Sequence, residues 1–237
     1  MIVGNGQISK AFQRYEDLSQ VVIFASGVAN SNCVDENEFE REKTLLLKHL
    51  TTLRGRKIVY FSSCALSATE YSLTPYYLHK KNMESLIKAH TKDYYIFRVP
   101  QLFGEMKKHP TLINYLYYSI KEGREFVLYD GAYRYLIELT DLHNIVIECL
   151  KIESSGITLD IANTYRYSTL EIVKDLESIL SIKAKYEIVK THDLYTIDLS
   201  GIVDFILKSK LDVKFGQDYL IKKLKLLNEK NKGMYDK

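Results

Sequence analysis

The chain has 237 residues, 46% hydrophobic and 27% charged, which is the composition of an ordinary globular protein. A formal net charge of +3 is too small to indicate a nucleic-acid-binding protein. No apolar run approaches the roughly 20 residues that cross a bilayer, and no secretory signal is visible, so we expect no membrane partner. Cys33, Cys64 and Cys149 are widely spaced and predict reduced thiols in a cytoplasmic protein.

Short apolar segments alternate with segments of helical spacing along the chain. The predicted strands are 1–3, 21–25, 57–62, 94–98 and 157–161. The predicted helices run from the turn after residue 3 to about 18, from about 36 to 53, from 75 to 89, and from about 168 to 180. This alternation predicts an α/β fold, a Rossmann-like doubly wound parallel sheet with helices on both faces. Because no linker is visible, residues 1–237 are predicted to form a single domain.

A glycine-containing turn joins the first strand to the first helix. Gly4-Asn5-Gly6-Gln7-Ile8-Ser9 has the spacing of the dinucleotide-binding fingerprint, with Ser9 in place of the third glycine. The first glycine permits the tight turn, and the second lets the backbone approach a pyrophosphate at the helix N-terminus. A tight turn without any ligand is the alternative interpretation.

Small residues end the second strand. Ala25, Ser26 and Gly27 leave room for a ligand at the carboxyl edge of a parallel sheet, where α/β proteins commonly bind their ligands. Taken alone, the segment is more typical of an ordinary Ser-Gly turn.

The residues with the clearest chemistry are Tyr76 and Lys80, which are four positions apart and share one face of a helix. A phenol normally ionises near pH 10, and an adjacent cation favours the phenolate. Ser62 and Ser63 end the preceding strand, and a serine hydroxyl there can hydrogen-bond the same substrate oxygen. With 19 tyrosines in the chain such pairs also arise by chance, and a second pair, Tyr77 with Lys81, follows in the next register.

The order of these segments resembles the extended short-chain dehydrogenase/reductase family, which comprises nucleotide-sugar epimerases, dehydratases and ketoreductases. The resemblance covers nearly the whole chain. It rests on the segments 4–8, 22–27, 58–63, 75–80, 98–104 and 131–141. The segment 75–80 matches the family's Pro-Tyr-x-x-x-Lys helix, and 131–141 matches its Gly-x-x-Arg segment with a following Asp.

The resemblance implies roles for individual residues. Tyr76 would be the general acid/base, Lys80 would lower its pKa and hold the nicotinamide ribose, and Ser63 would hydrogen-bond the reacting oxygen. Arg134 would bind the substrate diphosphate, although a surface arginine is an equal alternative. The residues implied to bind an NAD or NADP cofactor are Gly4, Gly6, Gln7, Ile8, Ala25, Ser26, Gly27, Ser62, Tyr76, Lys80, Val99, Pro100 and Leu102.

The chain departs from the family pattern near its N-terminus. Only one helix and a turn fit between Gly6 and Val21, so the second and third strands of the family's sheet are missing. The choice between NAD and NADP is therefore unreadable, and the adenosine side is open or supplied by another subunit. The C-terminal part is also short, and the resemblance places the substrate-binding region mainly in residues 104–150 and 182–237.

Dehydratases of the family carry an Asp-Glu pair after the catalytic hydroxyl, whereas this chain has Cys64 and Ala65. The resemblance thus implies NAD(P)-dependent reduction, or epimerisation, of a keto group on a nucleotide-linked deoxysugar in surface polysaccharide synthesis. A non-catalytic dinucleotide- or nucleotide-sugar-binding protein is the alternative. Family members pair through two helices, so a homodimer using the helix 76–89 is expected. The six histidines form no H-x-x-x-H or H-E-x-x-H pattern, and no metal site is predicted.

Overall fold

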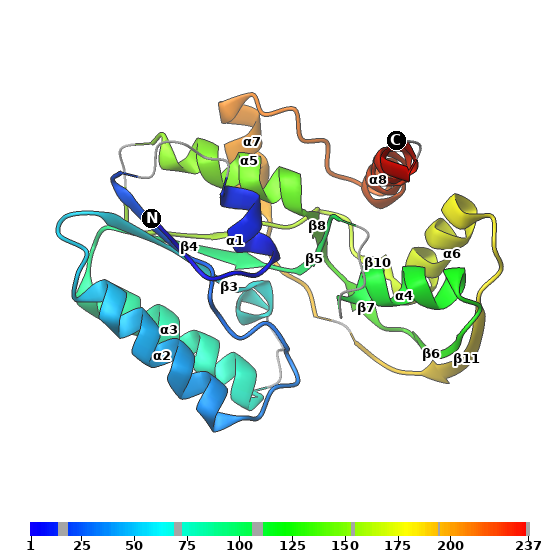
Figure 1. The fold of residues 1–237 in the computed structure, drawn as a ribbon, viewed down its shortest axis with the longest axis horizontal. Coiled ribbons are helices and arrows are strands. Elements are labelled where there is room, and N and C mark those ends of the chain that lie inside the picture. The colour runs from blue at the N-terminus through cyan, green and yellow to red at the C-terminus, as the bar shows by residue number, and fades with distance from the viewer. Residues whose placement is uncertain (14–18, 69–72, 106–110, 153–154, 194, 236–237) are drawn as a thin grey trace. The chain divides into compact units, whose positions relative to one another are not determined.

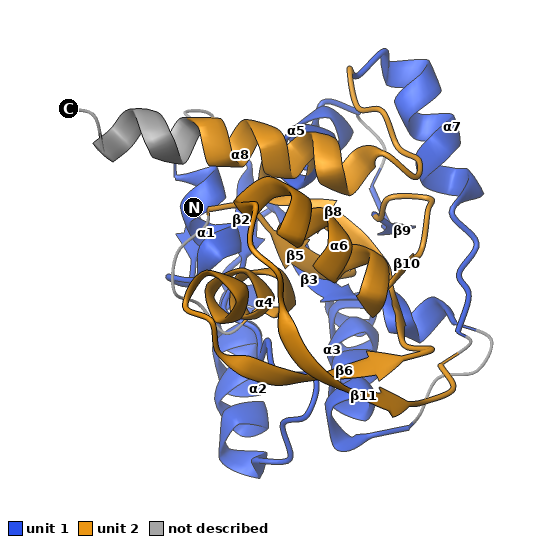
Figure 2. Cartoon of the chain, turned by 90° about the vertical axis from the view of Figure 1, so that its right-hand side faces the viewer, with its two compact units in different colours: residues 1–99, 142–161, 195–211 blue, residues 100–141, 162–194, 212–237 orange. Residues whose placement is uncertain are grey.

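A computed structural model describes residues 1–13, 19–68, 73–105, 111–152, 155–193 and 195–235. The contacts within the chain divide it into two compact units, drawn in different colours in Figure 2. Unit 1 comprises residues 1–99, 142–161 and 195–211, and unit 2 comprises residues 100–141, 162–194 and 212–237.

Unit 1 contains the predicted parallel sheet. Its strands are β1 (Ile2–Val3), β2 (Val21–Phe24), β3 (Lys57–Ser63), β4 (Tyr94–Val99) and β9 (Ile157–Asp160). They lie in the order β1-β2-β3-β4-β9, and every neighbouring pair is parallel. The five predicted strands are confirmed. The shortening is confirmed as well, since β1 is an edge strand with no further strand beyond it in the described residues, whereas the doubly wound fold has two strands outside its first one.

Helices cover both faces of this sheet, as predicted (Figure 1). On one side lie α2 (Glu36–Leu50) and α3 (Pro75–His90). On the other lie α1 (Gln7–Phe12), most of α5 (Leu139–Leu150) and α7 (Ser200–Ser209). The helix predicted to reach residue 18 is described only to Phe12, because residues 14–18 lie outside the described ranges. None of the helices in the described ranges is long and apolar enough to span a membrane.

Local sequence signals fix the ends of the two helices that carry the predicted site. The Asp35 carboxylate caps α2 by accepting from the backbone N–H of Asn37, and Thr74 caps α3 ahead of Pro75 in its first turn. The apolar side chains of both helices pack on β2, β3 and β4. The buried cluster that results consists of Val22, Phe24, Leu46, Leu50, Leu53, Ile58, Tyr60, Met83, Ile87 and Ile96.

In its described residues, unit 2 contains three two-stranded sheets, three helices and the first residues of α5. β5 (Gln101–Phe103) pairs with β8 (Leu136–Glu138) and β6 (Glu125–Asp130) with β11 (Lys185–Lys190), both parallel, and β7 (Tyr133–Arg134) pairs antiparallel with β10 (Tyr167–Ser168). The helices are α4 (Leu112–Lys121), α6 (Thr169–Leu180) and α8 (Tyr219–Tyr235).

Of the unit 2 elements, only α6 was predicted from the sequence. Its start is marked by a capping box in which Ser168 and Glu171 satisfy each other's backbone N–H groups. Within the predicted substrate-binding region, residues 142–150 and 195–211 belong to unit 1 and the rest to unit 2. That these residues bind the substrate stays a prediction.

Candidate active site

Tyr76 and Lys80 lie on the buried face of α3, next to each other. Their side chains are 7% and 2% exposed, and the Lys80 Nζ lies 5.8 Å from the centre of the Tyr76 ring. The alternative pair in the next register is placed differently, because Tyr77 is half-buried and Lys81 is exposed. The structure therefore brings the first phenol and ammonium together inside unit 1.

The end of β3 delivers the two predicted serines. Ser63 is the last residue of the strand, and its Oγ accepts from the backbone N–H of Ala65 at 3.4 Å, which caps a short 3-10 helix, η1 (Cys64–Ser67). Ser62 is buried, and its Oγ has no hydrogen-bond partner within the described ranges. Cys64 is close enough to Tyr76 to influence its ionisation, so the end of β3 and the start of α3 adjoin.

The Lys80 ammonium is bound by a carboxylate that the sequence analysis did not single out. Its Nζ lies 3.1 Å from Oε1 and 3.5 Å from Oε2 of Glu42, and 3.2 Å from the hydroxyl of Tyr60. Glu42 is fully buried on α2. The residue predicted to hold a cofactor ribose is thus already engaged in a buried ion pair.

Glu42 accepts four donors from the protein. They are the backbone N–H of Val28 at 2.6 Å, the Tyr60 hydroxyl at 2.6 Å, His79 Nε2 at 3.0 Å and Lys80 Nζ at 3.1 Å. Burial alone would raise the pKa of Glu42, but the Lys80 charge and these hydrogen bonds outweigh it and hold the pKa at about 2. Burial lowers the pKa of Lys80, and the Glu42 charge opposes that shift.

The expectation that Lys80 lowers the pKa of Tyr76 is wrong for this structure. The pKa of Tyr76 is raised, first by burial and then by Tyr77, Glu42 and Cys64. The Lys80 ammonium beside the phenol does not reverse this shift. It is paired with the Glu42 carboxylate, whose negative charge offsets the effect of the positive charge on Tyr76. Tyr76 is therefore a protonated phenol at neutral pH.

The predicted glycine turn lies between β1 and α1. Gly4 has a φ of +121°, and a Cβ at this position would lie 2.4 Å from the carbonyl oxygen of Ala25, so a glycine is required. Gly6 precedes α1, and a Cβ there would meet open space. Ser9 is buried and donates to the Gly4 carbonyl at 2.7 Å, which closes the turn. Gln7 and Ile8 form the first turn of α1.

The space beside Gly27 is filled by the ion pair. A Cβ on Gly27 would lie 2.6 Å from Lys80 Nζ and 3.0 Å from Glu42 Oε1. The small residue therefore makes room for these two protein side chains, and its predicted contact with a cofactor stays a prediction. Its neighbour Ser26 accepts long contacts of 3.4 to 3.5 Å from Arg41.

The remaining predicted site residues fall on both units. Val99 ends β4 in unit 1, whereas Pro100 and Leu102 belong to unit 2. Arg134 also belongs to unit 2, where its guanidinium donates to Asp193 at 2.5 Å and to the carbonyl of Tyr133 at 2.6 Å. The arginine predicted to bind a diphosphate is thus paired with a carboxylate.

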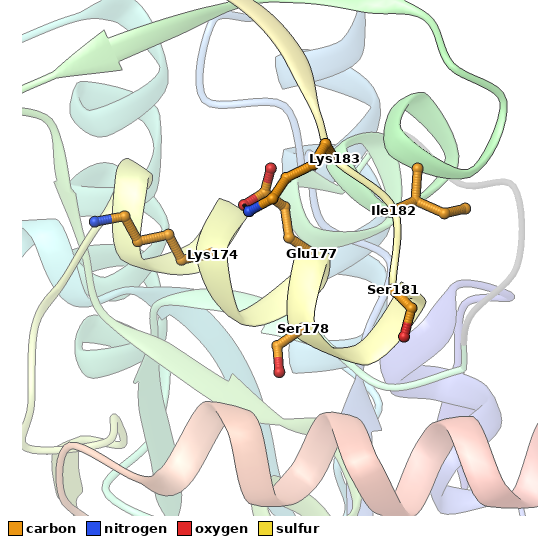
Figure 3. Close-up of a pocket in the computed structure, with 6 residues that line it drawn as sticks. All are labelled: Lys174, Glu177, Ser178, Ser181, Ile182 and Lys183. Atoms are coloured by element: carbon orange, nitrogen blue, oxygen red, sulfur yellow. Dashed lines mark hydrogen bonds and ion pairs between the residues drawn. The ribbon is translucent and has the colours of Figure 1, made fainter.

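A surface hollow of about 480 Å³ lies in unit 2 at the end of α6 (Figure 3). Two of the charged residues that line it form an ion pair with each other, since Lys183 Nζ lies 3.2 Å from Glu177 Oε2. None of the predicted site residues lines it. Within the described ranges, no group of three or more His, Cys, Asp or Glu side chains is arranged to hold a metal ion.

Glu42 is the site residue that the sequence analysis missed. On α2 it lies three positions after Phe39 and four before Leu46, so it falls in the apolar stripe of an otherwise amphipathic helix. A carboxylate in such a stripe is a signal for a buried ion pair, but helical spacing does not identify its partner.

A scan of protein-family models and a search of curated proteins found no match to the chain. Solved structures do match. They include dTDP-glucose 4,6-dehydratase from Bacillus anthracis (16% identity, TM-score 0.71, 90% of this chain and 74% of that chain) and UDP-glucose 4-epimerase from Thermus thermophilus (14%, 0.72, 95% and 81%). UDP-glucuronic acid 4-epimerase from Bacillus cereus also matches (17%, 0.71, 98% and 80%).

This chain therefore has a Rossmann-like α/β fold that matches the folds of these solved dehydratase and epimerase structures. Low sequence identity with a consistent TM-score means that the likeness is one of fold. Within that fold the chain is short, since it spans 74% to 81% of these solved chains. Part of the difference lies outside β1, which is an edge strand in the described residues, whereas the doubly wound fold places two further strands beyond its first one.

Proposed function

We propose that this chain is an NAD(P)-dependent enzyme that reduces, or epimerises, a keto group on a nucleotide-linked deoxysugar for surface polysaccharide synthesis. The observation that carries the proposal is the placement of Tyr76 and Lys80 side by side on α3, adjoining the end of β3 that supplies Ser63. The fold supports it, because the solved structures of this fold include an epimerase in complex with UDP-glucuronic acid and NAD.

The chain's own residues suit the binding of a dinucleotide in part. Gly4, Gly6 and Ile8 would hold its pyrophosphate, and open space beside Gly6 fits a close approach of the backbone. When bound, a nicotinamide supplies the hydride. Lys80 suits the binding of a nicotinamide ribose less well, because its ammonium is engaged by Glu42.

In the proposed reaction, Ser63 donates a hydrogen bond to the substrate carbonyl oxygen. Tyr76 donates its phenolic proton to that oxygen, so that the ketone gains a hydride at carbon and a proton at oxygen and becomes an alcohol. The phenol is protonated at neutral pH, as a donor must be, although its raised pKa makes it a weaker acid and disfavours the phenolate. This favours reduction over epimerisation, which also needs the phenolate as a base.

The test is Tyr76→Phe. We expect turnover to fall by at least about 100-fold, as for loss of a general acid, with the fold unchanged by circular dichroism. The assay follows oxidation of NADH and NADPH with a panel of nucleotide-linked 4-keto sugars. Tyr77→Phe, in the next register, is the matched control and should retain turnover. Full activity in the Tyr76→Phe protein would overturn the assignment.

A second candidate is a binding protein that holds a dinucleotide or nucleotide sugar without turnover. The shortened sheet favours it. Fluorescence titration with NADH, NADPH and nucleotide sugars separates the two candidates. Binding without turnover by the wild-type chain supports the second, whereas no binding of either cofactor rules out an NAD(P)-dependent enzyme.

A further inference from the structure

We propose that Glu42 is a positioning residue of this site, which acts through Lys80 by supplying the buried countercharge that keeps the ammonium charged and fixed beside Tyr76. The relevance of Glu42 to catalysis rests on the proposed function. The contacts of Glu42 with Lys80 and its neighbours do not depend on that function, and they can be tested without substrate.

The first support is the number of contacts on the carboxylate. An ionised carboxylate accepts only, and it has about four lone-pair sites. Val28, Tyr60, His79 and Lys80 donate to Glu42, so the protein fills all of them. Glu42 thus has no acceptor capacity left for a substrate, and its action must run through the groups it holds.

The second support is the identity of those groups. Lys80 and His79 come from the same turn of α3 as Tyr76, and Tyr60 comes from β3, the strand that ends in Ser63. Glu42 therefore ties together the two elements that carry the predicted catalytic side chains. His79 is held in turn by stacking on Phe39, with ring centres 4.6 Å apart.

The third support is the free-energy cost of burying the Glu42–Lys80 ion pair. Burying a carboxylate and an ammonium in a helix interface is expensive, and apolar side chains of similar size often stabilise such a site equally well. Gly27 fits closely over the pair, where a side chain would collide with Lys80 Nζ. The sequence thus supplies both a buried pair and a covering residue without a side chain, which a merely apolar contact between α2 and α3 does not need.

The charges around Lys80 leave Glu42 as its direct partner. Glu84, on α3, also acts favourably on the ammonium, but its carboxylate is engaged by the guanidinium of Arg98 at 2.6 and 2.9 Å. Arg41, on α2, acts unfavourably. From β3, Tyr60 contributes a hydroxyl rather than a charge. Without Glu42, the Lys80 ammonium would be buried beside two uncharged phenols, those of Tyr60 and Tyr76.

The experiment measures the ionisation of Lys80 in the full chain by NMR of protein labelled with ¹³C at lysine Cε, with the Lys80 signal assigned by its loss in Lys80→Met. In Glu42→Gln we expect Lys80 to lose its proton at a pH at least two units lower than in the wild type, because a buried ammonium without countercharge favours its neutral form. Glu38→Gln, an exposed change on the same helix, should leave the titration unchanged. Equal titration in wild type and Glu42→Gln would overturn the proposal.

A reciprocal measurement covers the case in which Glu42→Gln does not fold. In Lys80→Met the Glu42 carboxylate, followed by ¹³C at Glu Cδ, should titrate at a pH at least two units higher than in the wild type. An unchanged Glu42 titration would also overturn the proposal.

Cofactor affinity provides a readout that a purely structural role would not change. If the wild type binds NADH, its affinity in Glu42→Gln should fall as the pH rises through the lowered Lys80 titration, and Glu42→Asp should restore a flat profile. A pH-independent loss of affinity in Glu42→Gln would contradict a role through Lys80. Failure of the wild type to bind NADH or NADPH would reject the proposed function, while the two titrations would still decide the role of Glu42.

Discussion

Buried and half-buried ionisable side chains of unit 1 form a second network besides that of Glu42. Arg98 makes a two-bond ion pair with Glu84 and donates to Ser67 Oγ at 2.8 Å, and Ser67 donates to Asp160 Oδ2 at 2.6 Å. The other oxygen of Asp160, Oδ1, is buried without a hydrogen-bond partner in the described part of the chain. Burial therefore raises the pKa of Asp160 to about 6, despite the Ser67 hydrogen bond and the Arg98 charge.

This carboxylate makes stability depend on pH. Because the pKa of Asp160 is higher in the folded than in the unfolded chain, its contribution to stability is present below about pH 4 and is lost as the pH rises to about 6. Asp160→Asn keeps an acceptor for Ser67 and removes the charge. We expect it to raise the free energy of unfolding by about 1 kcal/mol at pH 7 and by less at pH 4.

Urea unfolding of both proteins at several pH values measures this difference. Asp212→Asn, at an exposed site, is the control and should follow the wild type at every pH. A gap between wild type and Asp160→Asn that stays constant from pH 4 to pH 7 would contradict the assignment.

At the scale of elements, one tyrosine at the start of α8 makes two buried hydrogen bonds to the rest of unit 2. The Tyr219 hydroxyl donates to Asp141 Oδ2 at 2.6 Å and accepts from the backbone N–H of Glu138 at 3.0 Å. One turn further, Lys223 donates to the other oxygen of Asp141 at 2.7 Å. These bonds join α8 to the end of β8 and the first turn of α5.

We expect Tyr219→Phe to lower the free energy of unfolding by about 1 to 3 kcal/mol, because it leaves the buried N–H of Glu138 without its acceptor. Tyr115→Phe, a change at a half-exposed tyrosine of α4, is the matched control and should stay within about 0.5 kcal/mol of the wild type. Thermal or urea unfolding of the three proteins measures both effects. Equal stability of Tyr219→Phe and the control would show that the hydroxyl does not hold α8.

At the scale of the whole molecule, the homodimer implied by the family resemblance stays a prediction, since a single chain does not test it. The predicted contact helix, α3, exposes Leu78, whereas Lys81, Asn82 and Ser85 on its exposed side are polar. Its neighbour α2 presents charged residues to solvent, including Glu40. An interface at these helices would therefore be largely polar, with Leu78 as its apolar contact.

Multi-angle light scattering over a range of concentrations tests the assembly. We expect twice the mass of one chain for the wild type and a shift towards the monomer for Leu78→Glu, which places a charge on the apolar contact. Val203→Glu on α7, a half-exposed apolar position outside the predicted interface, should not change the mass. A wild-type monomer at every concentration would reject the dimer.

The shortened sheet and the pairing of Tyr76 with Lys80 were predictable because they depend on local spacing. Apolar runs separated by amphipathic segments fix parallel strands, and a separation of four residues fixes a shared helix face. Caps and turn residues such as Thr74 and Gly4 fix where the elements begin. The strands of unit 2 were missed: β5, β7 and β8 have only two or three residues, which are too few positions for any periodicity to register, and the six-residue strands β6 and β11 were not recognised either.

The sequence by itself thus determined the strands of the parallel sheet and the face on which the phenol and the ammonium lie. Only the tertiary structure decided what surrounds them: Glu42 meets Lys80 from 38 residues away, Gly27 covers the pair, and Asp193 meets Arg134 from 59 residues away. Such contacts depend on how helices pack across a sheet, and residue spacing within one segment does not encode them. Because ionisation follows from burial and neighbouring charges, the raised pKa of Tyr76 could be obtained only once those neighbours were in place.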